Sequence, residues 1–199
     1  MPGEIETIYQ LFARLLDYPT PGLSQAALEC SRRIEPYSTE AALLLSSFGD
    51  FSQAVTLGCL EEAYTRAFDL NAAFQPYVGY HLFGDTYNRS PFLLGLSNLY
   101  RQHGFSAGKE LPDHLTVVLR FLAHCQDQGM RAELIQEALL PALQRMNHPQ
   151  RDEEREDEET DLVAELDSGQ NLYQPLLEAL EWLLQAVSTM REDRLINES

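Results

Sequence analysis

The chain has 199 residues, and its 31 Asp and Glu against 14 Lys and Arg give a formal net charge of −17. A surface this negative repels phosphate groups, so we expect neither nucleic acid nor a stable membrane association as a partner. The 44% hydrophobic content is enough for a hydrophobic core, which excludes a chain that is disordered throughout.

The three cysteines, Cys30, Cys59 and Cys125, lie far apart in the sequence. This spacing indicates neither a disulfide framework nor a zinc knuckle, and it fits a reducing compartment. The chain also lacks a run of about 18 apolar residues, which a membrane-spanning helix requires. Because the N-terminus has neither the basic nor the apolar region of a signal peptide, we interpret it as a first helix and expect a cytoplasmic protein.

Composition predicts an all-α fold, because 33 leucines stand against 11 valines and isoleucines combined. Apolar residues at helical spacing predict a first helix from Ile5 to Leu16, which ends at the prolines of residues 17–22. A short second helix follows, and a third, capped by Ser38 or Thr39, extends through Phe48. A fourth helix covers residues 57–68 and ends at Asp69.

Residues 71–89 contain Pro76, Gly79 and Gly84, so we expect a connector with a local turn, in which residues 77–83 form a strand only if they find a partner. Ser90 and Pro91 then predict a helix start, and this helix ends at Gly104. Two further helices are expected, over residues 112–129 with a stop at Gly129, and over residues 131–146, where Pro141 either kinks the helix or starts a new turn.

Residues 151–161 carry eight acidic side chains and two arginines, a net charge of −6. We predict a mobile acidic linker there, followed by an amphipathic helix over residues 172–187 that includes Trp182. The predicted organisation is a helical core at 1–147, a linker at 148–170 and a C-terminal helix with its tail at 171–199. The last helix docks either on its own bundle or on a second copy, which predicts a monomer or a domain-swapped dimer.

Motifs for metal, nucleotide or nucleophile chemistry are missing from the sequence, which contains no HExxH, CxxC, GxGxxG, P-loop or GxSxG pattern. We therefore predict no catalytic residues, no metal and no cofactor. We interpret Cys125 as a core cysteine beside a surface histidine, His124. Asp113 and His114 are similar to the HD pair of metal-dependent hydrolases, but in reversed order and without a second ligand motif, so a hydrolase is only an alternative.

Three segments resemble the NarJ branch of the TorD-like chaperones: EEAYTRAFDL at 61–70, HLFGDTYNRSP at 81–91 and ELPDHL at 110–115. These are the assembly chaperones of molybdenum enzymes, and the resemblance covers residues 4–146. It implies a single irregular helical bundle of the TorD-like type without catalytic activity. It also implies that the protein binds the N-terminal segment of an apo catalytic subunit of nitrate reductase type until the molybdenum cofactor is inserted.

The resemblance assigns partner binding to residues of these three segments: Tyr64, Phe68, Asp69, Asp85, Arg89, Glu110, Pro112, Asp113 and His114. On this interpretation the two aromatic residues line or support a groove, while the two aspartates Asp69 and Asp113 meet basic groups of the partner.

Structural alternatives apply to the same residues. The aromatic pair Tyr64 and Phe68 suits core packing, and Glu110 and Asp113 suit helix capping. Arg89 and Glu110 suit internal pairing, and His114 is either a pH-sensitive hydrogen-bonding group or a surface histidine near a cap. A helical adaptor that stays in a mature complex is the alternative function.

Overall fold

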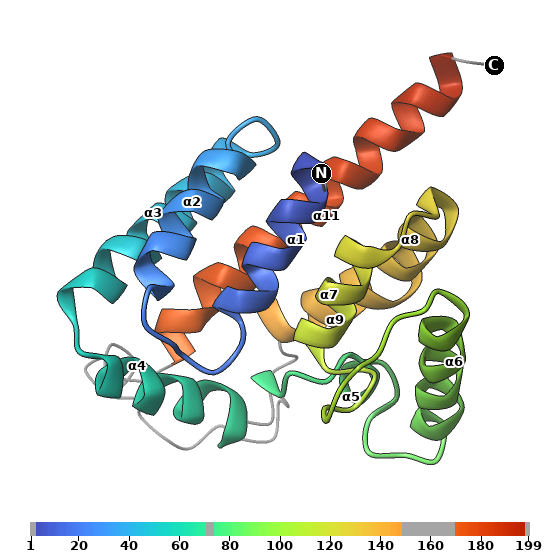
Figure 1. Cartoon of the computed structure of the whole chain (residues 1–199), viewed down its shortest axis with the longest axis horizontal. Coiled ribbons are helices and arrows are strands. Elements are labelled where there is room, and N and C mark those ends of the chain that lie inside the picture. Colours follow the sequence, from blue (N-terminus) through green and yellow to red (C-terminus); the bar gives the residue numbers. More distant parts are fainter. Residues whose placement is uncertain (1–2, 71–73, 149–169, 198–199) are drawn as a thin grey trace, which may run out of the picture.

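The computed structural model describes residues 3–70, 74–148 and 170–197, with the side chains of the last helix described from Leu172 to Arg191. Within these ranges every regular element is helical, and the only β-type pairing is an isolated bridge between Tyr77 and His114. The predicted all-α class is confirmed (Figure 1). The acidic linker predicted at 148–170 lies almost wholly outside the described residues.

The first three helices are α1 (Glu4–Leu15), α2 (Leu23–Ile34) and α3 (Thr39–Ala54), close to their predicted bounds. The Ser38 hydroxyl accepts a hydrogen bond from the Ala41 amide and caps α3, as one of the two predicted caps. Helix α1 packs against α2 and against α7, and α2 packs along α3. Helix α1 buries Ile8 and Phe12 of its predicted apolar face. Helix α3 buries Phe48 as predicted, but Leu43 is 64% exposed and Leu45 is buried in its place.

Helix α4 (Leu57–Tyr64) continues into a π-helical turn (Thr65–Asp69), so the predicted end at Asp69 is confirmed. The expected connector at 71–89 is wrong in part, because residues Val78–Phe83 form the short helix α5 rather than a turn or a strand. Its start depends on a distant side chain, since the Asp113 carboxylate accepts a hydrogen bond from the Gly79 amide. Gly84 follows with a φ of 65°, which ends the helix.

Helix α6 (Arg89–Gln102) has its N-cap at Asn88 rather than at Ser90, and Gly104 with a φ of 65° follows its end as predicted. The prediction of a single helix that ends at Gly129 is wrong. Helix α7 (Leu115–His124) ends earlier, and α8 (Gln128–Leu134) begins because the Asp127 carboxylate accepts hydrogen bonds from the amides of Gly129 and Met130. Gly129 therefore lies in the first turn of a helix rather than after one.

A second π-helical turn (Ile135–Leu139) leads from α8 into α9 (Leu140–Asn147), and Pro141 lies in the first turn of α9. Of the two roles expected for this proline, the start of a new turn is confirmed. Cys125 is buried and His124 is exposed, which confirms the core cysteine beside a surface histidine. Among the described helices none is both long and apolar enough to cross a lipid bilayer.

The last helix, α11 (Gln170–Asn197), lies against α3 and α9 of the same chain and also contacts α1 and α4. It crosses the middle of the molecule behind α1 in Figure 1. The large apolar side chains of its buried face are Tyr173, Leu176, Leu177, Leu180, Leu183 and Leu184. Tyr173 is fully buried, and its ring lies 5.6 Å from the ring of Tyr64 and 5.2 Å from that of Phe68, measured between centroids.

We predict that Tyr173→Ala lowers the free energy of unfolding by about 3–5 kcal/mol, because it removes a large aromatic side chain from a packed site. Urea unfolding followed by circular dichroism measures this loss. The matched control is Tyr87→Ala, which removes a tyrosine that is 87% exposed and should change the stability by no more than about 0.5 kcal/mol. Equal losses for the two variants would contradict the docking of α11 described above.

Candidate functional site

A cleft of about 380 Å³ opens where the loop after α1, the end of α4, residues 75–77 and residues 110–114 meet. We call it the acidic–aromatic cleft, because carboxylates and aromatic rings supply most of its lining. The lining residues are Asp17, Tyr18, Tyr64, Phe68, Asp69, Gln75, Pro76, Tyr77, Glu110 and His114.

The aromatic wall of the cleft is continuous with the core. The Tyr64 ring lies 4.9 Å from the ring of Phe68 and 5.5 Å from that of Tyr18, measured between centroids. The ring of Tyr173 packs behind Tyr64 and Phe68. Tyr64 and Phe68 are 7% and 2% exposed. Each of these two side chains therefore packs in the core and also lines the cleft, so the two expectations for the pair do not exclude each other.

Three carboxylates, those of Asp17, Asp69 and Glu110, give the cleft a negative potential. Burial raises the pKa of Tyr64 well above its ordinary value, and the charges of these three carboxylates raise it further. Asp17 lies 3.8 Å from Arg120, whereas Asp69 and Glu110 have no ion-pair partner in the part of the chain that the structure describes. Aromatic faces beside unpaired carboxylates are suited to a cationic side chain.

Behind the cleft, Asp113 and Arg89 form a buried ion pair. The Asp113 carboxylate is fully buried, and its Oδ2 lies 2.9 Å from both Nε and Nη2 of Arg89. The same oxygen accepts the hydrogen bond from the Gly79 amide at 3.2 Å. A Cβ on Gly79 would lie 2.7 Å from Oδ2 and 2.9 Å from Phe92, so only glycine allows α5 to approach this carboxylate so closely.

Backbone hydrogen bonds hold the two loop segments of the cleft together. The Val78 amide donates to the Asp113 carbonyl at 2.9 Å, and the Leu115 amide donates to the Pro76 carbonyl at 2.7 Å. The Tyr100 hydroxyl donates to the Pro112 carbonyl at 2.7 Å. Residues 76–78 and 112–115 therefore form one rigid corner beneath the cleft.

His114 caps helix α7. Its Nδ1 accepts a hydrogen bond from the Thr116 amide at 3.3 Å and lies 2.8 Å from the Thr116 hydroxyl, which assigns the proton of the neutral ring to Nε2. Burial lowers the pKa of His114 below its ordinary value. The residue is 7% exposed, so the expectation of a surface histidine is wrong, although its place at a helix cap is confirmed.

Five of the nine predicted site residues line the cleft: Tyr64, Phe68, Asp69, Glu110 and His114. Asp113, Arg89 and Pro112 lie behind it, and Arg89 pairs with Asp113 rather than with Glu110. Asp85 is exposed on the loop between α5 and α6 and is not part of the lining.

The sequence did not indicate the five other lining residues, which are Asp17, Tyr18, Gln75, Pro76 and Tyr77. In the sequence, Asp17 and Tyr18 indicate only the end of a helix. An acidic residue followed by an aromatic one at such an end was the available signal. In the ranges that the structure describes, there is no group of three or more His, Cys, Asp or Glu placed to hold a metal ion.

Over the described residues the chain is an irregular all-helical bundle with an acidic and aromatic cleft at one end of α7. Residues 35–153 match the family model described as nitrate reductase delta subunit, and because this match covers more than half of the chain, the chain belongs to that family.

Two curated proteins with similar sequences agree with this family membership. The chain is 35% identical over 89 residues to a probable nitrate reductase molybdenum cofactor assembly chaperone NarJ of Bacillus subtilis, covering 44% of this chain and 48% of that protein. It is 29% identical over 117 residues to the nitrate reductase molybdenum cofactor assembly chaperone NarJ of Escherichia coli strain K12, covering 57% and 50%. The chain thus spans about half the length of the curated relatives it matches.

We predict that Asp113→Asn lowers the free energy of unfolding by about 3 kcal/mol, because it leaves the Arg89 guanidinium without its charged partner in a buried site. For a chain of this size the melting temperature should fall by roughly 6–12 °C. Asp85→Asn, the same change on an exposed loop, is the control for thermal unfolding. An Asp113→Asn melting temperature that matches the control would contradict the structural role of the pair.

We predict that stability falls as the pH is lowered through the ordinary histidine pKa, in part because of His114. Since the pKa of His114 is lower in the folded state, the unfolded chain binds more protons in this range, and protonation favours unfolding. His114→Asn keeps an N-capping side chain but cannot titrate, so its unfolding free energy should depend less on pH between about pH 5 and about pH 8. His148→Asn, at an exposed histidine, should leave the wild-type dependence unchanged.

Proposed function

We propose that this chain is an assembly chaperone for a molybdenum enzyme of nitrate reductase type. It binds the N-terminal segment of the apo catalytic subunit in the cytoplasm, keeps the subunit competent to receive its molybdenum cofactor, and has no catalytic activity of its own. The observation that carries the proposal is the acidic–aromatic cleft, where three carboxylates and four aromatic rings surround a volume of about 380 Å³.

The cleft is suited to one or two side chains of a peptide rather than to a folded domain, because of its volume. A lysine or arginine there meets carboxylates at its charged end and aromatic faces along its stem. Leader segments of such catalytic subunits tend to be basic and amphipathic. The net charge of −17 attracts such a segment over a longer range, which raises the association rate more than the affinity.

Each predicted partner-binding residue takes a role from its position. Asp69 and Glu110 contact the cation directly, Tyr64 and Phe68 form the apolar wall, and His114 forms part of the floor, with Pro112 behind it. Asp113 and Arg89 position these groups through the backbone that they hold. Asp85 lies outside the cleft and stays a predicted contact with a more distant part of the partner.

The hydrolase alternative is weaker, because the two residues that it requires are already engaged. The Asp113 carboxylate is buried against Arg89, and His114 Nδ1 accepts from Thr116. The adaptor alternative uses the same cleft. It is distinguished by the captured partner, since a chaperone retains a catalytic subunit without molybdenum and an adaptor retains the loaded enzyme.

We predict that Asp69→Asn combined with Glu110→Gln raises the Kd for the N-terminal segment of the catalytic subunit about tenfold, because two charged contacts of roughly 0.7 kcal/mol each are lost. Isothermal titration calorimetry with a synthetic peptide measures the change. The same variant should recover less molybdenum-free catalytic subunit in a tagged pull-down from the native cytoplasm.

The matched control combines Asp50→Asn with Glu137→Gln, which removes the same charge at exposed positions on α3 and on the turn before α9. Equal weakening by the two double variants would show an effect of net charge alone and would reject the cleft as the binding site. Recovery of only molybdenum-loaded enzyme by the wild type would replace the chaperone with the adaptor.

A further inference from the structure

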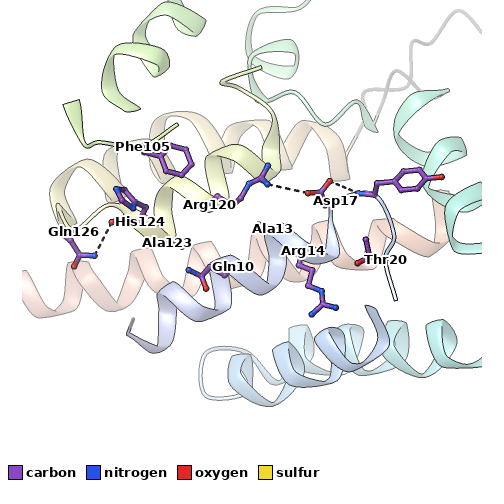
Figure 2. Close-up of a pocket in the computed structure, with 11 residues that line it drawn as sticks. Gln10, Ala13, Arg14, Asp17, Thr20, Phe105, Arg120, Ala123, His124 and Gln126 are labelled. Atoms are coloured by element: carbon purple, nitrogen blue, oxygen red, sulfur yellow. Dashed lines mark hydrogen bonds and ion pairs between the residues drawn. The ribbon is translucent and has the colours of Figure 1, made fainter. Parts of the chain in front are cut away.

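A second, larger groove runs beside the acidic–aromatic cleft. It has a volume of about 750 Å³ and lies between α1 and α7, so we call it the α1–α7 groove. Its floor includes two small residues, Ala13 from α1 and Ala123 from the end of α7, and Figure 2 shows polar side chains rising on both sides of them. A floor of this kind allows a peptide main chain to approach the two helices closely.

The groove and the cleft share a border. Asp17 and Tyr18 line both of them. Helix α7 also passes from one to the other, since His114 at its start lines the cleft, whereas Arg120 and His124 further along line the groove. A peptide that occupies the cleft therefore meets the groove as it continues along α7.

The charge of the groove is opposite to that of the cleft. Only 14 of the 199 residues are Lys or Arg, yet Arg14 and Arg120 both line this groove. In Figure 2 Arg120 extends from α7 toward Asp17, while Arg14 extends from α1 toward the loop that follows. The two cations thus border the groove from different walls.

The guanidinium groups of these arginines are only partly engaged by the protein. Nε and Nη2 of Arg120 donate to the carbonyl and hydroxyl of Thr116, and Nη1 lies 3.8 Å from Asp17, beyond hydrogen-bond distance. The Arg120 side chain is 44% exposed. Arg14 donates one hydrogen bond, from Nη2 to the Pro21 carbonyl at 3.1 Å. Donors remain on both side chains for an anionic group.

We propose that the α1–α7 groove is a second subsite for the same partner segment, in which Arg120, assisted by Arg14, binds an acidic side chain of that segment. The proposal rests on the proposed function, because the basic residue of the segment occupies the cleft. A cation in the cleft attracts Asp17 on the shared border. This weakens the attraction between Asp17 and Arg120 and favours binding of an anion beside Arg120. Occupation of one subsite therefore raises the affinity of the other.

The geometry also gives the spacing of the two charges in the partner. His114 and Arg120 are six residues apart on a helix that rises 1.5 Å per residue, which places the subsites about 9 Å apart along α7. An extended chain crosses this distance in about three residues and a helix in about six. The partner segment should therefore carry an acidic residue about three to six positions from its basic anchor.

A double-mutant cycle tests the proposal with the full chain and a synthetic peptide of the catalytic subunit's N-terminal segment. We expect Arg120→Gln to raise the Kd about fivefold, and the change of the matching acidic residue of the peptide to its amide to do the same. Combined, they should weaken binding no more than either change alone, because both remove one contact. Arg14→Gln provides a second variant that leaves α7 untouched, and thermal unfolding checks that each variant is folded.

Arg101→Gln, at an exposed arginine on α6, is the charge-matched control. If Arg120→Gln and Arg14→Gln behave as this control while the variant of Asp69 and Glu110 still binds poorly, the second subsite is rejected and the proposed function stands. If the wild-type chain does not bind the segment at all, the proposed function itself fails. Binding of inorganic pyrophosphate that is lost in Arg120→Gln, with unchanged peptide affinity, would assign the groove to a small anion and overturn the proposal.

Discussion

The buried ion pair of Asp113 and Arg89 is the interaction on which the candidate site depends. A carboxylate removed from water costs several kcal/mol unless its charge and its lone pairs are satisfied, so its surroundings must supply fixed donors. Here the donors come from two directions, from the guanidinium at the start of α6 and from the Gly79 amide in α5, and all of them reach Oδ2. The other oxygen, Oδ1, is buried without a hydrogen-bond partner among the described residues. One side chain thus joins α5, α6 and the segment before α7. Because that segment carries Glu110 and His114 into the cleft, the position of both follows from a pair that lies behind them.

The aromatic wall connects this site to the C-terminal helix. Tyr64 and Phe68 face the cleft on one side and pack against Tyr173 of α11 on the other. Core and site are therefore built from the same rings, and a change in the docking of α11 reaches the cleft through direct contact. This also explains why the apolar spacing of residues 57–68 was compatible with two interpretations, since each ring fulfils both.

The helices that could be predicted from the sequence are those with a long apolar face, such as α1, α3 and α11. Helix α5 could not be predicted, because its first turn is held by the carboxylate of Asp113, more than thirty positions away in the sequence. A six-residue segment has little helical preference without such a contact. The break between α7 and α8 was missed because Gly129 suggested a helix end, whereas the local cap at Asp127 starts a helix there. In the site, five residues of the sequence motifs line the cleft. Local spacing could not indicate that Asp113 is buried, nor that the loop with Asp17 and Tyr18 folds back over the cleft.

The distribution of charge constrains what the site can distinguish. A net charge of −17 attracts any basic segment, but salt screens this attraction beyond about 8 Å at physiological ionic strength, so it cannot select one partner among many. Selection requires contacts at shorter range. Within the proposed binding mode, a cationic groove directly beside an anionic cleft provides them, because a uniformly basic peptide that enters the cleft would bring its next positive charge against Arg120. Under this model the arginines reject incorrect segments as well as bind the correct one, so a chain with so few cations gains specificity by placing two of them in the groove beside the acidic–aromatic cleft.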